Sequence, residues 1–200
     1  LVTAFPDRFA NVVLANGGLP TGMIPEQYAA PLKAAYKTLP VVKARELGER
    51  FRDKTAIPGF LYWRKFCAES PDLEIGEVMA AVSHAPMSAG EISAYAAPFP
   101  DQGYMAGARR FPSLVPVFHD EPEVGENEAA WEVLRRFDKP FLLAFSDDDP
   151  VTAGGDKKFL AEVPGCRGAA HRTIGNAGHF LQQDQPGQCV DAILAVNGRS

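Results

Sequence analysis

Two stretches near the C-terminus decide the fold: PFLLAFSDDDPVT (Pro140–Thr152) and HRTIGNAGHFLQ (His171–Gln182). The first opens with a fully apolar run and the second with a β-like run, so each is expected to begin as a strand. A loop with a polar side chain follows each strand, Asp149 in the first and His179 in the second. A third strand is predicted at NVVLAN (Asn11–Asn16). Because helical segments alternate with strands at both ends of the chain, we expect a parallel sheet.

The middle of the chain has little strand signal and several amphipathic helical segments. Ser88 and Glu91 form a capping box that predicts one helix start, while Pro31 is expected to break or kink an earlier segment. We therefore expect an α/β core interrupted by a helical cap. The predicted boundaries are residues 1–18 for the first part of the core, 19–112 for the cap and 113–200 for the rest of the core.

Two further predictions concern the helix that precedes the Pro140 strand. Asn127 is expected to cap this helix, which is predicted to continue to Phe137. Trp131 lies on the apolar face of the same segment together with Leu134, and is expected to belong to the core.

Composition limits the classes of function. The chain has 200 residues, 46% of them hydrophobic, and a formal net charge of −5. No run of Lys and Arg is present, which argues against partners such as nucleic acid or an anionic membrane. No apolar stretch is long enough to span a bilayer. The three cysteines are scattered and unpaired in sequence, which indicates a reduced, cytoplasmic setting and no reactive or metal-binding role.

Asp149 and His179 together predict a catalytic pair. A carboxylate that follows one strand and a histidine that follows the next is the order of acid and base in α/β-hydrolases, where the nucleophile comes first. The carboxylate orients the imidazole, and the imidazole takes a proton from a nucleophile or from water. Taken singly, Asp149 is equally compatible with a solvated Asp–Pro turn and His179 with a loop histidine. Neither a G-x-S-x-G nor a G-x-D-x-G nucleophile elbow occurs in the chain.

The other chemistry-bearing residues favour no metal and no cofactor. His84, His119 and His171 have no Asp, Glu or Cys at metal-ligand spacing, and HExxH, P-loop and GxGxxG motifs are absent from the sequence. Trp63, in the helical segment FLYWRKF, is compatible with core packing. Its alternative role is to point an indole N–H into a cavity, where this neutral donor would suit an anion.

Five motifs together resemble the haloalkane dehalogenases of the α/β-hydrolase superfamily. The resemblance covers nearly the whole chain, and it is closest to the branch in which the acid follows the strand before the histidine strand. The pair SAYAAPFPD and YMAGARRFP carries more specificity than the motifs that all hydrolases of this fold share. The motifs are LPTG (Leu19–Gly22), SAYAAPFPD (Ser93–Asp101), YMAGARRFP (Tyr104–Pro112), PFLLAFSDDDPVT and NAGHFLQ.

The resemblance implies a reaction that needs only a small halogenated hydrocarbon and water. An aspartate nucleophile attacks the carbon that bears the halogen and forms an alkyl-enzyme ester. His179 then activates water to hydrolyse the ester, Asp149 balances the charge of His179, and the products are an alcohol, a halide ion and a proton. Two indole N–H groups bind the leaving halide. One of them matches Trp63, and Phe60 matches an aromatic residue that lines the same cavity.

The same resemblance implies that this chain is the C-terminal part of such an enzyme. The nucleophile and the tryptophan that follows it belong to a segment that precedes the residues present here. The 200 residues alone are therefore expected to be inactive. An epoxide hydrolase or another α/β-hydrolase stays an alternative, since Tyr62, Tyr95 and Tyr104 are available as donors to an epoxide oxygen. A non-catalytic remnant or a binding module is a third alternative. An upstream D-W-G elbow would favour the dehalogenase, and an upstream G-x-S-x-G elbow would favour an esterase.

Overall fold

The computed structural model describes residues 1–54 and 57–198, and it divides into two compact units. The first unit comprises residues 1–19 together with the chain from residue 125 onward, and the second comprises residues 20–124. Residues 113–124, which the sequence analysis assigned to the core, lie in the second unit. The designation of the units as core and cap stays a prediction.

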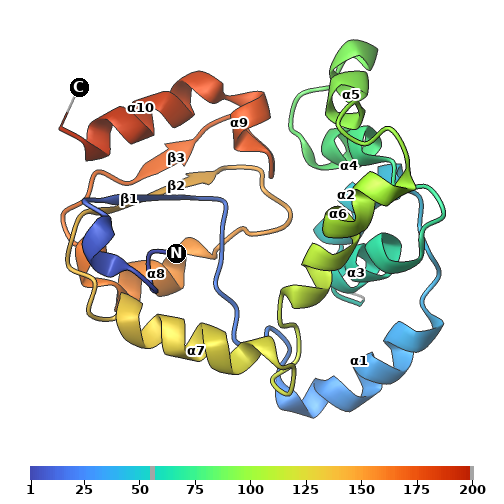
Figure 1. The fold of residues 1–200 in the computed structure, drawn as a ribbon, viewed down its shortest axis with the longest axis horizontal. Helices are drawn as coiled ribbons and strands as arrows, with labels where there is room; N and C mark the ends of the chain where they lie inside the picture. Colours follow the sequence, from blue (N-terminus) through green and yellow to red (C-terminus); the bar gives the residue numbers. More distant parts are fainter. Residues whose placement is uncertain (55–56, 199–200) are drawn as a thin grey trace. The chain divides into compact units, whose positions relative to one another are not determined.

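A three-stranded parallel sheet forms the centre of the first unit (Figure 1). The strands are β1 (Val12–Ala15), β2 (Phe141–Ser146) and β3 (Arg172–Ile174), in the order β1-β2-β3. Leu14 pairs with Leu143, and Phe145 pairs with Thr173. The predicted parallel sheet is therefore confirmed, with β2 in the middle as its apolar run requires.

Helices cover both faces of this sheet, as Figure 1 shows. Alternate residues of β2 point to opposite faces. Leu142 and Ala144 pack with the helices at the C-terminal end of the chain, and Phe141 and Leu143 pack on the other face. The elements around the sheet are η1 (Pro6–Arg8), α7 (Glu123–Leu134), α8 (Asp156–Glu162), η5 (Pro164–Cys166), α9 (Leu181–Asp184) and α10 (Pro186–Val196).

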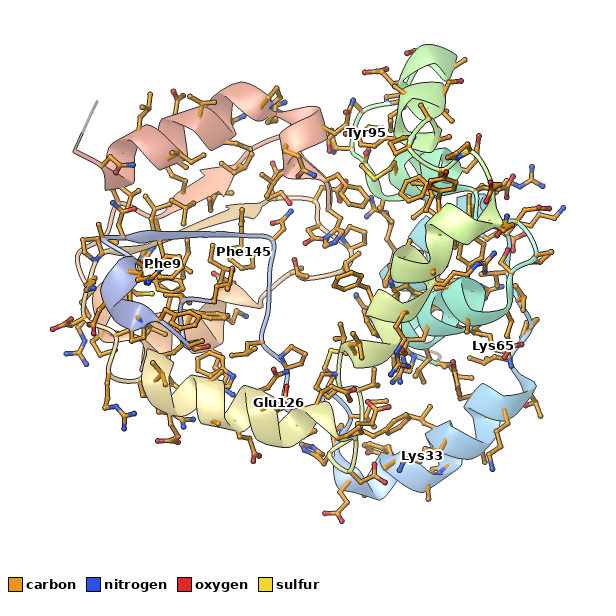
Figure 2. All side chains as sticks on the ribbon, viewed as in Figure 1. Phe9, Lys33, Lys65, Tyr95, Glu126 and Phe145 are labelled. Atoms are coloured by element: carbon orange, nitrogen blue, oxygen red, sulfur yellow. The ribbon has the colours of Figure 1, made fainter. Side chains whose placement is uncertain are left out.

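Trp131 is the centre of the cluster between the sheet and helices α7 and α8. Its side chain is fully buried, its ring lies 4.8 Å from that of Phe159, and its indole N–H donates to the Leu19 carbonyl at 2.8 Å. Phe9 and Phe145 pack at the margin of this cluster (Figure 2). The predicted core position of Trp131 is confirmed.

Helix α7 begins earlier and ends earlier than the sequence analysis predicted. It runs from Glu123 to Leu134, so Asn127 lies inside the helix instead of capping it. Pro122 directly precedes the helix, and proline is favourable at a helix start because its fixed φ suits the first turn. The proline signal outweighed the capping preference of asparagine at this position.

In the described part of the second unit, every regular element is a helix. Ile24, Leu39, Leu61, Val117 and Phe118 form one of its buried clusters. Its elements are α1 (Glu26–Thr38), η2 (Ala44–Glu46), α2 (Leu47–Arg52), α3 (Gly59–Glu69), α4 (Ile75–Val82), α5 (Ala89–Ala96), η3 (Gln102–Met105), α6 (Ala106–Arg110) and η4 (Phe111–Leu114).

Two local predictions in the second unit have different outcomes. Ser88 caps α5, and Glu91 completes the capping box by accepting from the Ser88 main-chain N–H at 2.8 Å, as predicted. Pro31 was predicted to break or kink its segment; the break is wrong, because Pro31 lies inside the continuous helix α1, and the kink stays a prediction. Packing of Ala29, Leu32 and Tyr36 against the neighbouring cluster compensates for the hydrogen bond that proline cannot donate.

The segments that enter and leave the second unit are bonded to each other. The main-chain N–H groups of Met23 and Ile24 both donate to the carbonyl of Val117, at 2.8 and 3.0 Å. Gly22 has a positive φ of 95°, and a Cβ atom there would lie 2.4 Å from Nδ1 of His119. Only glycine meets both requirements. In the described part of the chain, no helix is both long and apolar enough to cross a membrane.

Candidate active site

The loops that follow β1, β2 and β3 all lie at the carboxyl edge of the parallel sheet. Because all three strands run in the same direction, the residues that follow them gather at their carboxyl ends. Asn16 follows β1, Asp147 follows β2 and Gly175 follows β3. The loop after β2 carries Asp149 and the loop after β3 carries His179, so the topology brings the two predicted residues to the same edge.

Asp149 is buried and accepts several hydrogen bonds from its own loop. Its side chain is 1% exposed. Oδ1 accepts the main-chain N–H of Val151 at 2.7 Å, and Oδ2 accepts the main-chain N–H of Thr152 at 3.1 Å as well as the Thr152 hydroxyl. These bonds form an Asx-type turn that holds the carboxylate in one orientation. The solvated-turn alternative for Asp149 is therefore excluded.

His179 faces this carboxylate. Its Nδ1 lies 3.1 Å from Oδ1 and 3.2 Å from Oδ2 of Asp149, and its side chain is 23% exposed. An ionised carboxylate can only accept hydrogen bonds, so Nδ1 must carry the hydrogen and Nε2 keeps a free lone pair in the neutral ring. The Phe180 ring lies 5.1 Å away and limits the space beside the imidazole. This arrangement is that of an oriented base with one basic nitrogen available.

The charge state of Asp149 follows from two opposing effects. Burial alone would raise the pKa of Asp149, because it disfavours the charged form. Hydrogen bonds from His179, Thr152 and Val151, together with the attraction of His179, outweigh burial and leave this pKa below its ordinary value. Asp149 is therefore ionised at neutral pH, as the assigned histidine tautomer requires.

Asp147 contacts the histidine loop, which the sequence analysis did not anticipate. The residue is exposed, yet its carboxylate accepts the main-chain N–H of Asn176 at 3.0 Å and that of Ala177 at 3.2 Å. The side chain thus bridges the loop after β2 to the loop after β3.

Asn16 is the second contact that the sequence analysis missed. Its residue is 8% exposed and has a positive φ of 37°. Its Nδ2 donates to the carbonyls of Gly178 and His179, both at 3.0 Å, and to Oγ of Ser146 at 2.7 Å. Its Oδ1 accepts the main-chain N–H of Ser146 at 2.9 Å. The only sequence signal for this role is a polar residue directly after an apolar strand.

Trp63 and Phe60, the two predicted substrate-site residues, both lie on helix α3 of the second unit. They are one turn apart and both half-buried. The Trp63 ring stacks on that of Phe66 with centroids 6.0 Å apart. Packing on Phe66 orients the indole, and the described residues place no acceptor within hydrogen-bond distance of its N–H.

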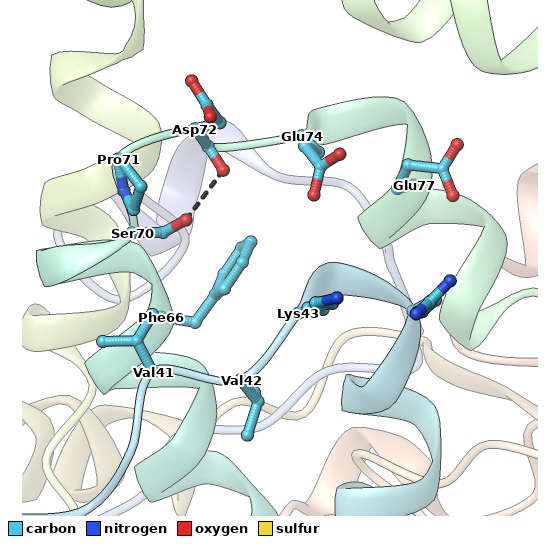
Figure 3. Close-up of a pocket in the computed structure, with 10 residues that line it drawn as sticks. Val41, Val42, Lys43, Phe66, Ser70, Pro71, Asp72, Glu74 and Glu77 are labelled. Atoms are coloured by element: carbon cyan, nitrogen blue, oxygen red, sulfur yellow. Dashed lines mark hydrogen bonds between the residues drawn. The ribbon is translucent and has the colours of Figure 1, made fainter.

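A groove of about 650 Å³ opens elsewhere in the second unit (Figure 3). Lys43 lies on one side of it, and Asp72, Glu74 and Glu77 lie on the other. Its floor includes Phe66, but none of the four predicted site residues lines it. Within the second unit, Trp63 therefore contacts a residue that lines the groove, Phe66, without lining the groove itself.

His171 has a structural explanation, and two of the cysteines are buried. His171 accepts the main-chain N–H of Leu143 through Nδ1 at 3.0 Å and bonds the Cys166 carbonyl through Nε2 at 2.9 Å. Burial raises the pKa of Cys67 to about 12 and that of Cys166 to about 11. Among the residues described, no three His, Cys, Asp or Glu side chains are grouped closely enough to hold a metal ion.

Comparison with known sequences identifies relatives along almost the whole chain. A haloalkane dehalogenase of Psychrobacter cryohalolentis is 42% identical over 194 residues, which is 97% of this chain and 54% of that protein. A haloalkane dehalogenase of Mycobacterium marinum is 36% identical over 189 residues, which is 94% of this chain and 53% of that protein. The chain is a relative of the haloalkane dehalogenases. It spans about half the length of the curated relatives that it matches, and no protein-family model matches it.

Solved haloalkane dehalogenases share the fold. The structure of DatA from Agrobacterium tumefaciens gives a TM-score of 0.63 at 16% identity, covering 100% of this chain and 62% of that one. The tetrameric DpaA from Paraglaciecola agarilytica gives a TM-score of 0.61 at 18% identity, covering 100% of this chain and 54% of that one. The chain therefore has part of an α/β-hydrolase fold, with the parallel sheet and the helical unit that the sequence analysis predicted.

Proposed function

We propose that this chain supplies the acid–base pair of a haloalkane dehalogenase. The observation that carries the proposal is the buried, ionised Asp149 bonded to Nδ1 of His179 at the carboxyl edge of a parallel sheet. The names of the relatives supply the substrate class, a haloalkane.

The reaction divides into two steps, of which the first needs no base. A carboxylate nucleophile attacks the carbon that bears the halogen, the new carbon–oxygen bond forms, and the carbon–halogen bond breaks with its electron pair leaving on the halide. The product is an alkyl ester of the enzyme. The elbow motif that would carry this nucleophile does not occur in the sequence, so we propose that a segment outside these 200 residues provides it.

His179 acts in the second step. Its Nε2 takes a proton from water while the oxygen of that water attacks the ester carbonyl, and collapse of the intermediate releases the alcohol and regenerates the carboxylate. The imidazolium that forms carries its positive charge next to Asp149, whose ionised carboxylate stabilises it. The proton leaves to solvent, so each turnover yields one alcohol, one halide ion and one proton.

Trp63 is proposed to donate its indole N–H to the leaving halide, with Phe60 lining the same cavity. The halide gains its charge in the transition state, and a neutral donor already in place stabilises that charge without reorganisation. Stacking on Phe66 would keep the indole in one orientation for this purpose.

The test uses the full-length protein that carries these residues, incubated with short bromoalkanes and chloroalkanes. We expect halide and alcohol in equal amounts, with a rate that excess EDTA leaves unchanged because no step uses a metal. The 200-residue chain alone is expected to release no halide. Halide release that stops with EDTA, or a full-length protein that opens epoxides but releases no halide, would contradict the proposal.

A further inference from the structure

We infer that Asn16 and Asp147 are positioning residues that fix the orientation of the His179 ring. The inference rests on the proposed function, because it assigns these residues to the step in which His179 activates water. Neither side chain is proposed to touch the substrate. Each binds the main chain of the loop between β3 and α9, and their contacts fall on either side of the same short turn.

Asn16 holds the C-terminal end of that turn. Both carbonyls that its Nδ2 reaches belong to the peptide units of Gly178 and His179. A carbonyl that accepts a hydrogen bond fixes its own peptide plane, and two fixed planes in sequence fix the direction of the Cα–Cβ bond of His179. Ser146 adds a third bond, since its hydroxyl donates to the Gly178 carbonyl at 2.7 Å.

The backbone of Asn16 shows that the side chain is held in place at a conformational cost. Its φ of 37° lies in the left-handed region, which asparagine tolerates better than most residues but which is still unfavourable. The side chain is buried and uses both its amide nitrogen and its amide oxygen in hydrogen bonds. A residue that is strained and fully bonded fits a role in geometry better than a role in packing.

Asp147 holds the N-terminal end of the turn. Its two carboxylate oxygens accept the main-chain N–H groups of Asn176 and Ala177, one each. Asp147 lies two residues before Asp149, so one loop carries both the carboxylate that binds the His179 ring and the carboxylate that binds the main chain of the His179 loop. The distance between Asp149 and His179 is therefore set by contacts on the backbone as well as on the side chain.

The experiment measures the two chemical steps separately in the full-length protein. Asn16→Gly keeps the positive φ favourable and removes all the amide bonds. Its matched control is Asn176→Gly, which makes the same change at an exposed residue with a φ of 57° and keeps the main-chain N–H that donates to Asp147. Asp147→Asn removes one of the two acceptors, and Asp138→Asn at an exposed position is its control for charge.

We expect ester hydrolysis to slow by about tenfold to a hundredfold in Asn16→Gly and in Asp147→Asn, because a misplaced base loses much of its effect. Carbon–halogen cleavage in a single turnover should stay within about twofold, since it needs no base, and both controls should lose far less. Equal slowing of both steps, or no slowing of either, would overturn the positioning role. If Asn16→Gly does not fold, the same two rates are compared in Asp147→Asn alone, because Asp147 is exposed.

A second measurement does not depend on the proposed reaction. The Nδ1 proton of His179 lies between the ring and Asp149, and proton NMR follows its exchange with water. We expect exchange at least about tenfold faster in both variants than in their controls. Unchanged exchange in both variants overturns the inference. Absence of halide release from the unmodified protein, with exchange still accelerated, refutes the proposed function and leaves the positioning role intact.

Discussion

Replacing Asp149 by asparagine tests the proposed pair most directly, because the change removes one charge and one acceptor at almost constant volume. Asp149 faces donors on both oxygens: Val151 N–H on Oδ1, Thr152 N–H on Oδ2, and Nδ1–H of His179 between them. An amide has one oxygen and one NH2 group. Whichever way the new amide is turned, its NH2 group therefore faces a main-chain N–H that loses its acceptor.

The structure gives the size of the effect on stability. An unsatisfied buried N–H costs about 1–3 kcal/mol, and a lost hydrogen bond to a charged group costs about 1.5–3 kcal/mol. These contributions are not additive within one network, so we expect about 3 kcal/mol in the free energy of unfolding measured with urea. The ester-hydrolysis step should slow by about four orders of magnitude, as the same change does in serine-protease triads. Asp148→Asn, one residue earlier, is the matched control and should cost far less in both assays.

The difference in stability should also depend on pH, with a sign that the structure fixes. The folded pKa of Asp149 is below its ordinary value of about 4, so its ionised form stabilises the folded protein fully above about pH 4. This contribution is lost as the pH falls through the lower folded pKa. The difference in unfolding free energy between the unmodified protein and Asp149→Asn should therefore become smaller below about pH 4. A gap that stays constant down to about pH 3, or an Asp149→Asn variant that hydrolyses the ester at the normal rate, would refute the reasoning.

Three further predictions concern the full-length protein. His179→Ala should accumulate the alkyl-enzyme ester after one turnover, visible by mass spectrometry as the mass of the alkyl group, because cleavage of the halide needs no base; normal turnover would make His179 a bystander. Trp63→Phe keeps the ring that stacks on Phe66 but removes the donor, so halide binding and carbon–halogen cleavage should weaken by about tenfold to a hundredfold. A variant that melts earlier but binds halide as before would make Trp63 a packing residue only. Gly22→Ala should cost about 1–3 kcal/mol in unfolding free energy because of its positive φ, and more if the His119 ring cannot move; an unchanged urea midpoint would contradict this.

The sheet and the Asp149–His179 pair could be predicted because their signals are local. The run PFLLAF is apolar on both faces, as a central parallel strand must be, and β2 begins at the second residue of this run and ends one residue after it. The hydrogen bond between Asp149 and His179 follows from strand order, since each residue comes shortly after a strand that ends at the same edge. Their catalytic roles stay predictions.

Asn16 and Asp147 could not be predicted because their partners are main-chain groups far away in the sequence. Asn16 is separated from His179 by 163 positions, and Asp147 from Ala177 by 30. A main-chain N–H or carbonyl is present at almost every residue, so the sequence carries no pattern that marks which one is bonded. The errors at Asn127 and Pro31 have another cause, because in each case the preference of a single residue was weighed alone. At Pro31 the packing of helix α1 overrides that preference, and at Asn127 the proline at position 122 does.

The hydrogen bonds that join Met23 and Ile24 to Val117 have an evolutionary consequence. They bring the two ends of a segment of about one hundred residues together within the segment itself. The entropy of closing a loop grows only slowly with its length once its ends are pinned. Residues between these ends can therefore be lengthened, shortened or exchanged at little cost to the rest of the molecule. A lineage could in this way acquire a different second unit by changing one continuous stretch of its gene, while the residues around Asp149 and His179 stayed the same.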